Sequence, residues 1–142
     1  MVATVSAGQK PAYRPRRYGY VELMRVYLDV CCLGRSSDDQ SQPRIRAEAE
    51  AVKEILFLVR AGHIGLISSE ALQLEVQKNP SLERRSRAES FLVLASRTVR
   101  VDTAITIRAG QLESLGYGAF DALHLASAES LLADVLLPTD DR

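Results

Sequence analysis

Hydrophobic positions along the chain follow two alternating patterns. Short apolar runs bounded by turn residues predict buried strands. We expect these strands at residues 25–33, 64–67, 98–101 and 134–138. The first run contains the sequence VYLDVCCLG, in which the single charged residue Asp29 stands near the expected end of the strand.

Between these runs, apolar residues recur at helical spacing. The spacing predicts helices at about residues 44–61, 69–78, 81–96, 103–115 and 121–133. Gly62, Asn79-Pro80 and Gly116 provide stop signals. Either Ser68 or Ser69 can cap the second helix, and either Asp102 or Thr103 the fourth.

Strands that alternate with helices are typical of a three-layer α/β/α fold with a parallel central sheet. A length of 142 residues suits one domain. In such sheets, ligands bind outside the carboxyl ends of the strands. Asp29 stands near the end of the first expected strand and Asp140 just past the end of the last, so both are candidates for a binding site.

Composition narrows the class of protein. With 46% hydrophobic and 25% charged residues, the chain can bury a core. No apolar run is long enough to span a bilayer, and the adjacent Cys31 and Cys32 suit the reducing cytoplasm. Residues 1–23 carry a net charge of +3 and residues 24–142 a net charge of −3. We expect residues 1–23 to be a disordered basic tail, or Met24 to be the true start.

Four carboxylates are candidates for chemistry: Asp29, Glu75, Asp121 and Asp140. Each also has a structural explanation, such as a helix cap for Asp121 or a solvated helix face for Glu75. If they converge, a cation would offset their mutual repulsion. Oxygen ligands without His or Cys suit Mg²⁺ or Mn²⁺, which serve phosphoryl chemistry. A metal-dependent nuclease is therefore one hypothesis.

Four segments together resemble the motifs of the PIN-domain family. They are VYLDVCCLGR, SSEALQLEV, DALHLASAE and LLPTDDR, in the family's order and within residues 24–142. The resemblance implies a PIN-like α/β/α domain whose acidic pocket binds Mg²⁺ or Mn²⁺ and cleaves RNA. It also implies a VapC-like toxin with a cognate antitoxin protein, a homodimer and a cytoplasmic location.

Carried over motif by motif, the resemblance assigns roles to single residues. Asp29 would be the first-strand metal ligand, Glu75 the helix carboxylate, Asp121 the helix-start ligand and Asp140 the last-strand carboxylate. Thr139 would supply the hydroxyl beside that strand end. The four carboxylates would form the catalytic metal site, and Thr139 would contact the substrate.

Two departures from the family pattern bear on activity. Cys31 stands where many members have a polar residue, and the sequence stops at Arg142 without the usual C-terminal helix and strand. We therefore expect apolar surface near Leu136 and Leu137 to be exposed. A catalytically inactive, truncated PIN-like domain that binds RNA or a protein is the alternative function.

Basic residues and one histidine complete the candidates. Arg35 and Arg44 flank the loop after Asp29 and could bind RNA phosphates. His124 is expected to be a surface or lightly packed residue, with substrate contact as the lesser alternative. The arginines at 84, 85 and 87 are expected on a solvated helix face or in an antitoxin contact.

Overall fold

The computed structural model describes residues 23–137. Within that range, four strands alternate with helices. The strands are β1 (Met24–Leu28), β2 (Ile64–Ser69), β3 (Arg97–Val99) and β4 (Val135–Leu137). The helices are α1 (Val30–Gly34), η1 (a 3-10 turn, Arg35–Ser37), α2 (Pro43–Arg60), α3 (Glu70–Gln77), α4 (Leu82–Leu92), α5 (Thr103–Ser114) and α6 (Ala119–Ser130).

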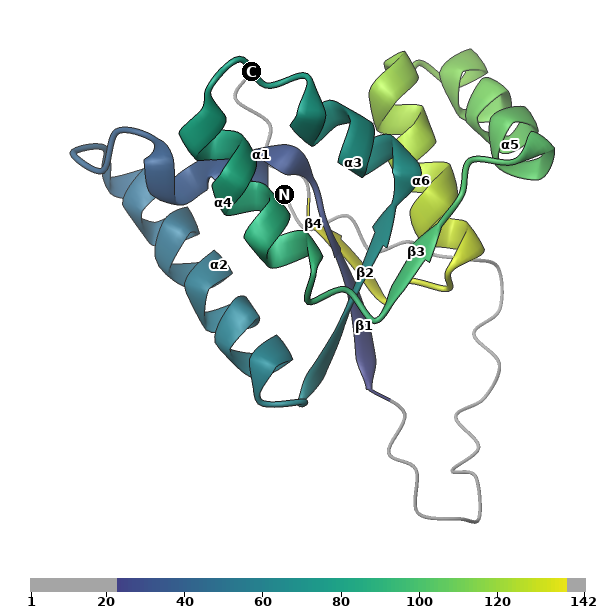
Figure 1. The fold of residues 1–142 in the computed structure, drawn as a ribbon. Helices are drawn as coiled ribbons and strands as arrows, with labels where there is room; N and C mark the ends of the chain where they lie inside the picture. The colour runs from purple at the N-terminus through teal and green to yellow at the C-terminus, as the bar shows by residue number, and fades with distance from the viewer. Residues whose placement is uncertain (1–22, 138–142) are drawn as a thin grey trace, which may run out of the picture.

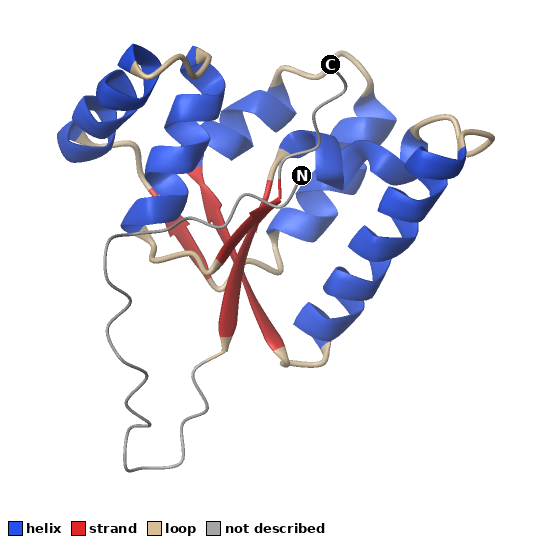
Figure 2. Cartoon of the chain, turned by 180° about the vertical axis from the view of Figure 1, so that it is seen from behind, coloured by secondary structure: helices blue, strands red, loops and turns tan. Residues whose placement is uncertain are grey.

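The strands form one parallel sheet in the order β3-β2-β1-β4. Helices α2 and α4 lie on one side of it and α5 and α6 on the other, as Figure 1 shows and Figure 2 repeats from behind. This arrangement confirms the predicted α/β fold with a parallel central sheet. The two central strands are largely apolar, as burial on both faces requires.

Helices α1 and α3 follow the carboxyl ends of β1 and β2, at the upper edge of the sheet in Figure 1. Because β4 is parallel to β1, α6 must return against the strand direction and so begins at this same edge. The residues just after β1 and β2 and the first turn of α6 therefore share one end of the molecule. This is the end at which α/β sheets bind ligands.

The first predicted strand is too long. It was expected over residues 25–33, but β1 ends at Leu28 and Val30–Gly34 form the helix α1. The Asp29 side chain caps this helix, because its Oδ1 accepts a hydrogen bond from the Cys32 N–H at 3.0 Å. An apolar run alone does not distinguish a strand from a short helix. Here the cap starts a helical turn that still buries Cys32 and Leu33.

Other boundaries shift by a few residues. Strand β2 continues through two buried serines to Ser69, which is the residue that caps α3. Helix α4 ends at Leu92, four residues before the predicted end. Helix α6 begins at Ala119, so Asp121 is its third residue rather than its first. The predicted stops hold at Gly62 and Gly116, whose φ angles of +77° and +103° suit glycine.

The last strand is better covered than expected. Leu136 is buried, with 7% of its surface exposed, and it belongs to the main hydrophobic core. Leu137 is half-buried. The prediction of exposed apolar surface is therefore wrong for Leu136, because β4 packs against β1 and its side chain faces the core. No helix in the described part of the chain is long and apolar enough to cross a membrane.

Helix α3 offers a direct test of the core. Leu72 is 1% exposed, whereas Leu74 on the same helix is 51% exposed. We predict that Leu72→Ala lowers the free energy of unfolding by about 2–5 kcal/mol, because it removes apolar contacts and leaves a cavity. Leu74→Ala is the control and should change stability by less than about 0.5 kcal/mol. Equal losses in urea unfolding would contradict the observed orientation of α3.

Candidate functional site

A continuous chain of polar side chains crosses the interior near the carboxyl end of the sheet. The Tyr27 hydroxyl lies 2.6 Å from Ser69 Oγ and 2.8 Å from His124 Nδ1. His124 Nε2 lies 2.6 Å from Glu75 Oε2. Tyr27 and Ser69 are fully buried, His124 is buried, and the Glu75 side chain is 30% exposed. The chain of hydrogen bonds therefore leads from the core to the surface at Glu75.

The electrostatics of Tyr27 place two candidate carboxylates nearby. Burial raises the pKa of the phenol far above its ordinary value of 10.0. The hydrogen bond with Ser69 partly lowers this pKa, and the negative charges of Glu75 and Asp29 raise it again. Such effects decay with distance. Glu75 and Asp29 therefore both lie close enough to Tyr27 to act on it, and the phenol stays protonated at neutral pH.

Asp121 lies on the element that carries His124, one helical turn earlier. Its side chain turns back toward the start of α6, since Oδ2 lies 3.6 Å from the position that a Cβ on Gly118 would occupy. A carboxylate in the first turn is stabilised by the helix dipole. Asp29 and Asp121 thus each lie within three residues of the directly bonded pair Tyr27 and His124.

Three of the predicted metal ligands have suitable donor atoms, but they do not form a complete cluster in the described residues. Asp29, Glu75 and Asp121 offer carboxylate oxygens, which fit a hard cation such as Mg²⁺ or Mn²⁺. Within residues 23–137, however, no three side chains of the metal-ligating types are grouped to hold a metal ion. Glu75 is already bound to His124, and Asp29 caps α1.

The remaining predicted members, Thr139 and Asp140, lie outside the described residues. The last described residue, Leu137, is tied to the start of α1. Its carbonyl oxygen accepts from the Asp29 N–H at 3.4 Å and from Cys32 Sγ at 3.0 Å. The end of β4 therefore adjoins Asp29.

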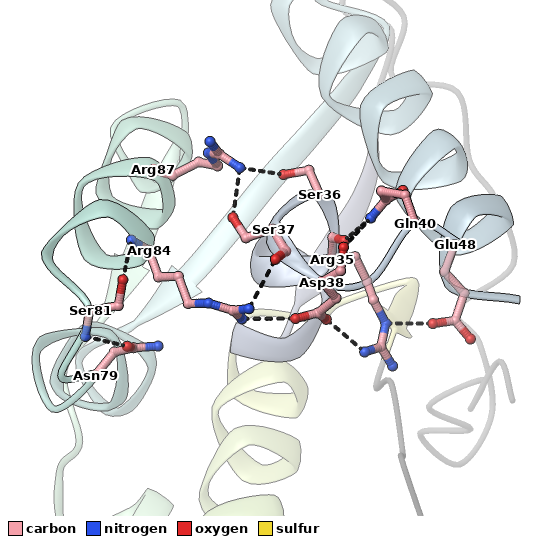
Figure 3. Close-up of polar contacts among 10 residues, drawn as sticks. All are labelled: Arg35, Ser36, Ser37, Asp38, Gln40, Glu48, Asn79, Ser81, Arg84 and Arg87. Atoms are coloured by element: carbon pink, nitrogen blue, oxygen red, sulfur yellow. Dashed lines mark hydrogen bonds and ion pairs between the residues drawn. The ribbon is translucent and has the colours of Figure 1, made fainter. Parts of the chain in front are cut away.

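Arg35 is buried and takes part in two ion pairs that stabilise the fold. It is 3% exposed, its Nε donates to Glu48 at 2.6 Å, and its Nη1 donates to Asp38 at 2.9 Å (Figure 3). Burial and these two carboxylate partners occupy the guanidinium, so they do not favour the contact with an RNA phosphate, which stays a prediction. Partial burial opposes the ionisation of Glu48, but the hydrogen bonds from Arg44 and Arg35 prevail and lower its pKa.

Arg44 remains a candidate for phosphate contact. Its side chain is 65% exposed and donates to Glu48 at 2.8 Å. It borders an open depression of about 440 Å³ that Asp38 and Asp39 also line. These two carboxylates would repel a phosphate, so the depression itself does not favour RNA.

The arginines of α4 hold the turn η1 in place. Arg84 donates to Asp38 at 2.8 Å and to the Ser37 carbonyl at 3.0 Å. Arg87 donates to Ser37 Oγ at 2.6 Å (Figure 3). Arg84 and Arg87 therefore connect α4 to the segment after α1 and do not lie on a solvated face alone, while the alternative of an antitoxin contact stays a prediction.

The sequence prediction missed Tyr27 and Ser69 as members of the site and misplaced His124. The sequence predicts a surface or lightly packed His124, but only 5% of this residue is exposed and both ring nitrogens are bonded. Two signals could have found them. Tyr27 brings a hydroxyl into a strand whose other members include Val26 and Leu28, and a buried tyrosine hydroxyl needs a partner. His124 stands within a helix built mainly from Ala and Leu.

Comparison with known proteins adds little. No protein-family model matches the chain, and no curated protein matches it. Among solved structures, the crystal structure of FitAcB from Neisseria gonorrhoeae is similar, with 20% sequence identity over 76% of this chain and 83% of that chain. The TM-score is 0.48. A likeness of this strength assigns neither a family nor a function.

The raised pKa of Tyr27 predicts a specific alkaline instability. Above pH 10 or so, the unfolded chain releases the phenolic proton while the folded protein keeps it. The unfolded state then binds fewer protons, so the free energy of unfolding falls by about 1.4 kcal/mol per pH unit from this group. Tyr27→Phe should remove this contribution, whereas Tyr117→Phe, at a residue that is 49% exposed, should not. Urea unfolding across alkaline pH measures both slopes, and identical slopes would refute the assignment.

The two arginines bound to Glu48 should differ in their effect on stability. Arg35→Ala breaks a buried ion pair, which typically costs about 3–5 kcal/mol. We expect about 2–3 kcal/mol here, because Arg44 and Arg84 still compensate the two carboxylates. Arg44→Ala, at an exposed pair, should cost less than about 1 kcal/mol. Thermal unfolding compares the two variants, and an equal cost would contradict the structural position of Arg35.

Proposed function

We propose that this protein is a Mg²⁺- or Mn²⁺-dependent endoribonuclease of the PIN type. The observation that carries the proposal is the bonded chain Tyr27–His124–Glu75. It joins β1, which Asp29 directly follows, to α6 and α3, which hold Asp121 and Glu75. Three of the four expected carboxylates are therefore on, or directly after, elements that meet at the ligand-binding end of the sheet.

The fourth expected carboxylate, Asp140, lies outside the described residues and close in sequence to the end of β4. Strand β4 ends beside Asp29, through the bonds of the Leu137 carbonyl, and Asp140 comes three residues later in the sequence. Asp29, Glu75, Asp121 and Asp140 would hold the cation. When bound, it would neutralise the phosphodiester and lower the pKa of a water molecule.

Neighbouring residues of the protein would orient the carboxylates that bind the cation. The Cys32 N–H fixes Asp29, and His124 fixes Glu75, so both carboxylates are oriented without a cation. Arg44 is the exposed guanidinium that could bind an RNA phosphate, and Thr139 the hydroxyl beside Asp140. An antitoxin partner, a homodimer and a cytoplasmic location remain predictions from the family resemblance.

A second function has its own support. The part of the chain that the structure describes holds no grouped set of three metal-ligating side chains. Glu75 and Asp29 both have protein partners that explain their presence. These observations favour a non-catalytic PIN-like domain that binds RNA or a protein.

Cleavage of RNA separates the two functions. We predict that the protein cleaves single-stranded RNA in Mn²⁺ or Mg²⁺, and that Asp29→Asn lowers the rate at least about 100-fold by removing a ligand charge. Asparagine is also a good helix cap, so α1 should stay folded. Glu113→Gln, an exposed change on α5, should leave the rate unchanged.

Metal binding measured by thermal unfolding completes this test. Mn²⁺ should raise the melting temperature of the parent protein by mass action and should raise that of Asp29→Asn less. Cleavage that survives Asp29→Asn or chelation with EDTA would refute the metal-dependent nuclease. RNA binding without cleavage, and without a metal shift, would establish the second function.

A further inference from the structure

The series of hydrogen bonds through the buried polar side chains begins and ends on helix α3. The Leu72 N–H of α3 donates to Ser69 Oγ at 3.1 Å. Ser69 contacts Tyr27, Tyr27 contacts His124, and His124 contacts Glu75, which lies on α3 three residues after Leu72. The hydrogen bonds thus form a closed ring through the sheet and α6. The ring holds the Glu75 carboxylate against its own helix.

The donors and acceptors in this closed series of hydrogen bonds can all be assigned in one consistent direction. A carboxylate only accepts, so Nε2 of His124 must donate to Glu75. Ser69 is fully buried, and within residues 23–137 the acceptor in reach of its hydroxyl hydrogen is the Tyr27 oxygen. Tyr27 then donates its own hydrogen to Nδ1 of His124. Every donor in the ring finds an acceptor when His124 carries its hydrogen on Nε2.

We propose that His124 and Tyr27 are positioning residues for the Glu75 carboxylate. Tyr27 holds Nδ1 and so the orientation of the His124 imidazole, and Nε2 of His124 holds Oε2 of Glu75, so that the carboxylate keeps one orientation. The orientation of Glu75 is a property of the fold. Its importance for cation binding and cleavage rests on the proposed function.

The exposure of Glu75 explains why such a device is useful. A glutamate that is 30% exposed would otherwise sample several rotamers. A carboxylate at a reacting centre must keep one orientation, and hydrogen bonds from neighbouring side chains supply it. The buried position of His124 protects this bond from competition with water.

Variants at His124 separate positioning from packing. In His124→Gln the side-chain amide can still donate to Glu75 and accept from Tyr27, whereas His124→Leu can do neither. We expect His124→Leu to weaken Mn²⁺ binding, measured by calorimetry, by about 10–100-fold. His124→Gln should bind close to the parent's affinity, and His63→Gln, at an exposed histidine, is the control. Equal binding by the Leu and Gln variants would overturn the proposal.

Nuclear magnetic resonance of the metal-free protein tests the hydrogen bonds of His124 without an activity assay. Ring ¹⁵N shifts of His124 at neutral pH should show a hydrogen on Nε2 alone. Tyr27→Phe removes only the phenol hydroxyl, so the hydrogen should stay on Nε2, where Glu75 accepts it, while the Nδ1 signal should shift because Nδ1 loses its hydrogen-bond donor. A hydrogen on Nδ1, or an unchanged spectrum in Tyr27→Phe, would overturn the proposal even where the His124 variants do not fold.

The two proposals fail in different ways. If the parent neither binds Mn²⁺ nor cleaves RNA, the proposed function fails, and the ¹⁵N spectra alone decide the positioning of Glu75. If the parent cleaves RNA and His124→Leu, still folded by circular dichroism, has the same kcat, positioning fails and the nuclease stands. Under the proposal, kcat falls in His124→Leu while KM for RNA stays close to the parent's value.

Discussion

The burial of one phenol hydroxyl constrains the whole carboxyl end of the sheet. Tyr27 lies on a central strand and is inaccessible to water, so its hydroxyl must be satisfied by protein groups. Ser69 at the end of β2 and His124 on α6 meet this need. Because His124 has a second ring nitrogen, satisfying Tyr27 also fixes a partner for Glu75 on α3. One buried group thus relates β1, α6 and the consecutive elements β2 and α3.

The local parts of this architecture could be predicted from the sequence. Helix spacing, capping serines and the glycines at 62 and 116 depend on neighbouring residues, so they identify most elements to within a few positions. The segment after Asp29 was misassigned because VCCLG suits a strand and a short helix equally well in its apolar pattern. The capping bond from Cys32 to Asp29 decides between them, and the pattern does not contain it.

Partnerships between distant residues could not be predicted in the same way. Tyr27 and His124 are 97 positions apart, and Glu75 and His124 are 49 apart. Their meeting depends on strand order and on the rotation of α6, neither of which a single sequence specifies. The burial of Arg35 could not be predicted for a related reason. Arginine is seldom buried, and the ion pairs with Glu48 and Asp38, which help to make its burial tolerable, depend on the fold.

The hydrogen bonds of Asp29 and Glu75 also explain how these carboxylates can lie at the carboxyl end of the sheet, the acidic edge of the molecule. Carboxylates gathered without donors would repel one another and would call for a cation. Here Asp29 accepts from a backbone N–H and Glu75 accepts from an imidazole, so each carries local compensation in the metal-free protein. The acidity of this edge is therefore compatible with stability and does not by itself demand a metal. What the hydrogen bonds add is orientation, because Oε2 of Glu75 is bound to Nε2 of His124. A cation that binds here would meet a carboxylate that has already lost its rotational freedom, which lowers the entropic cost of binding.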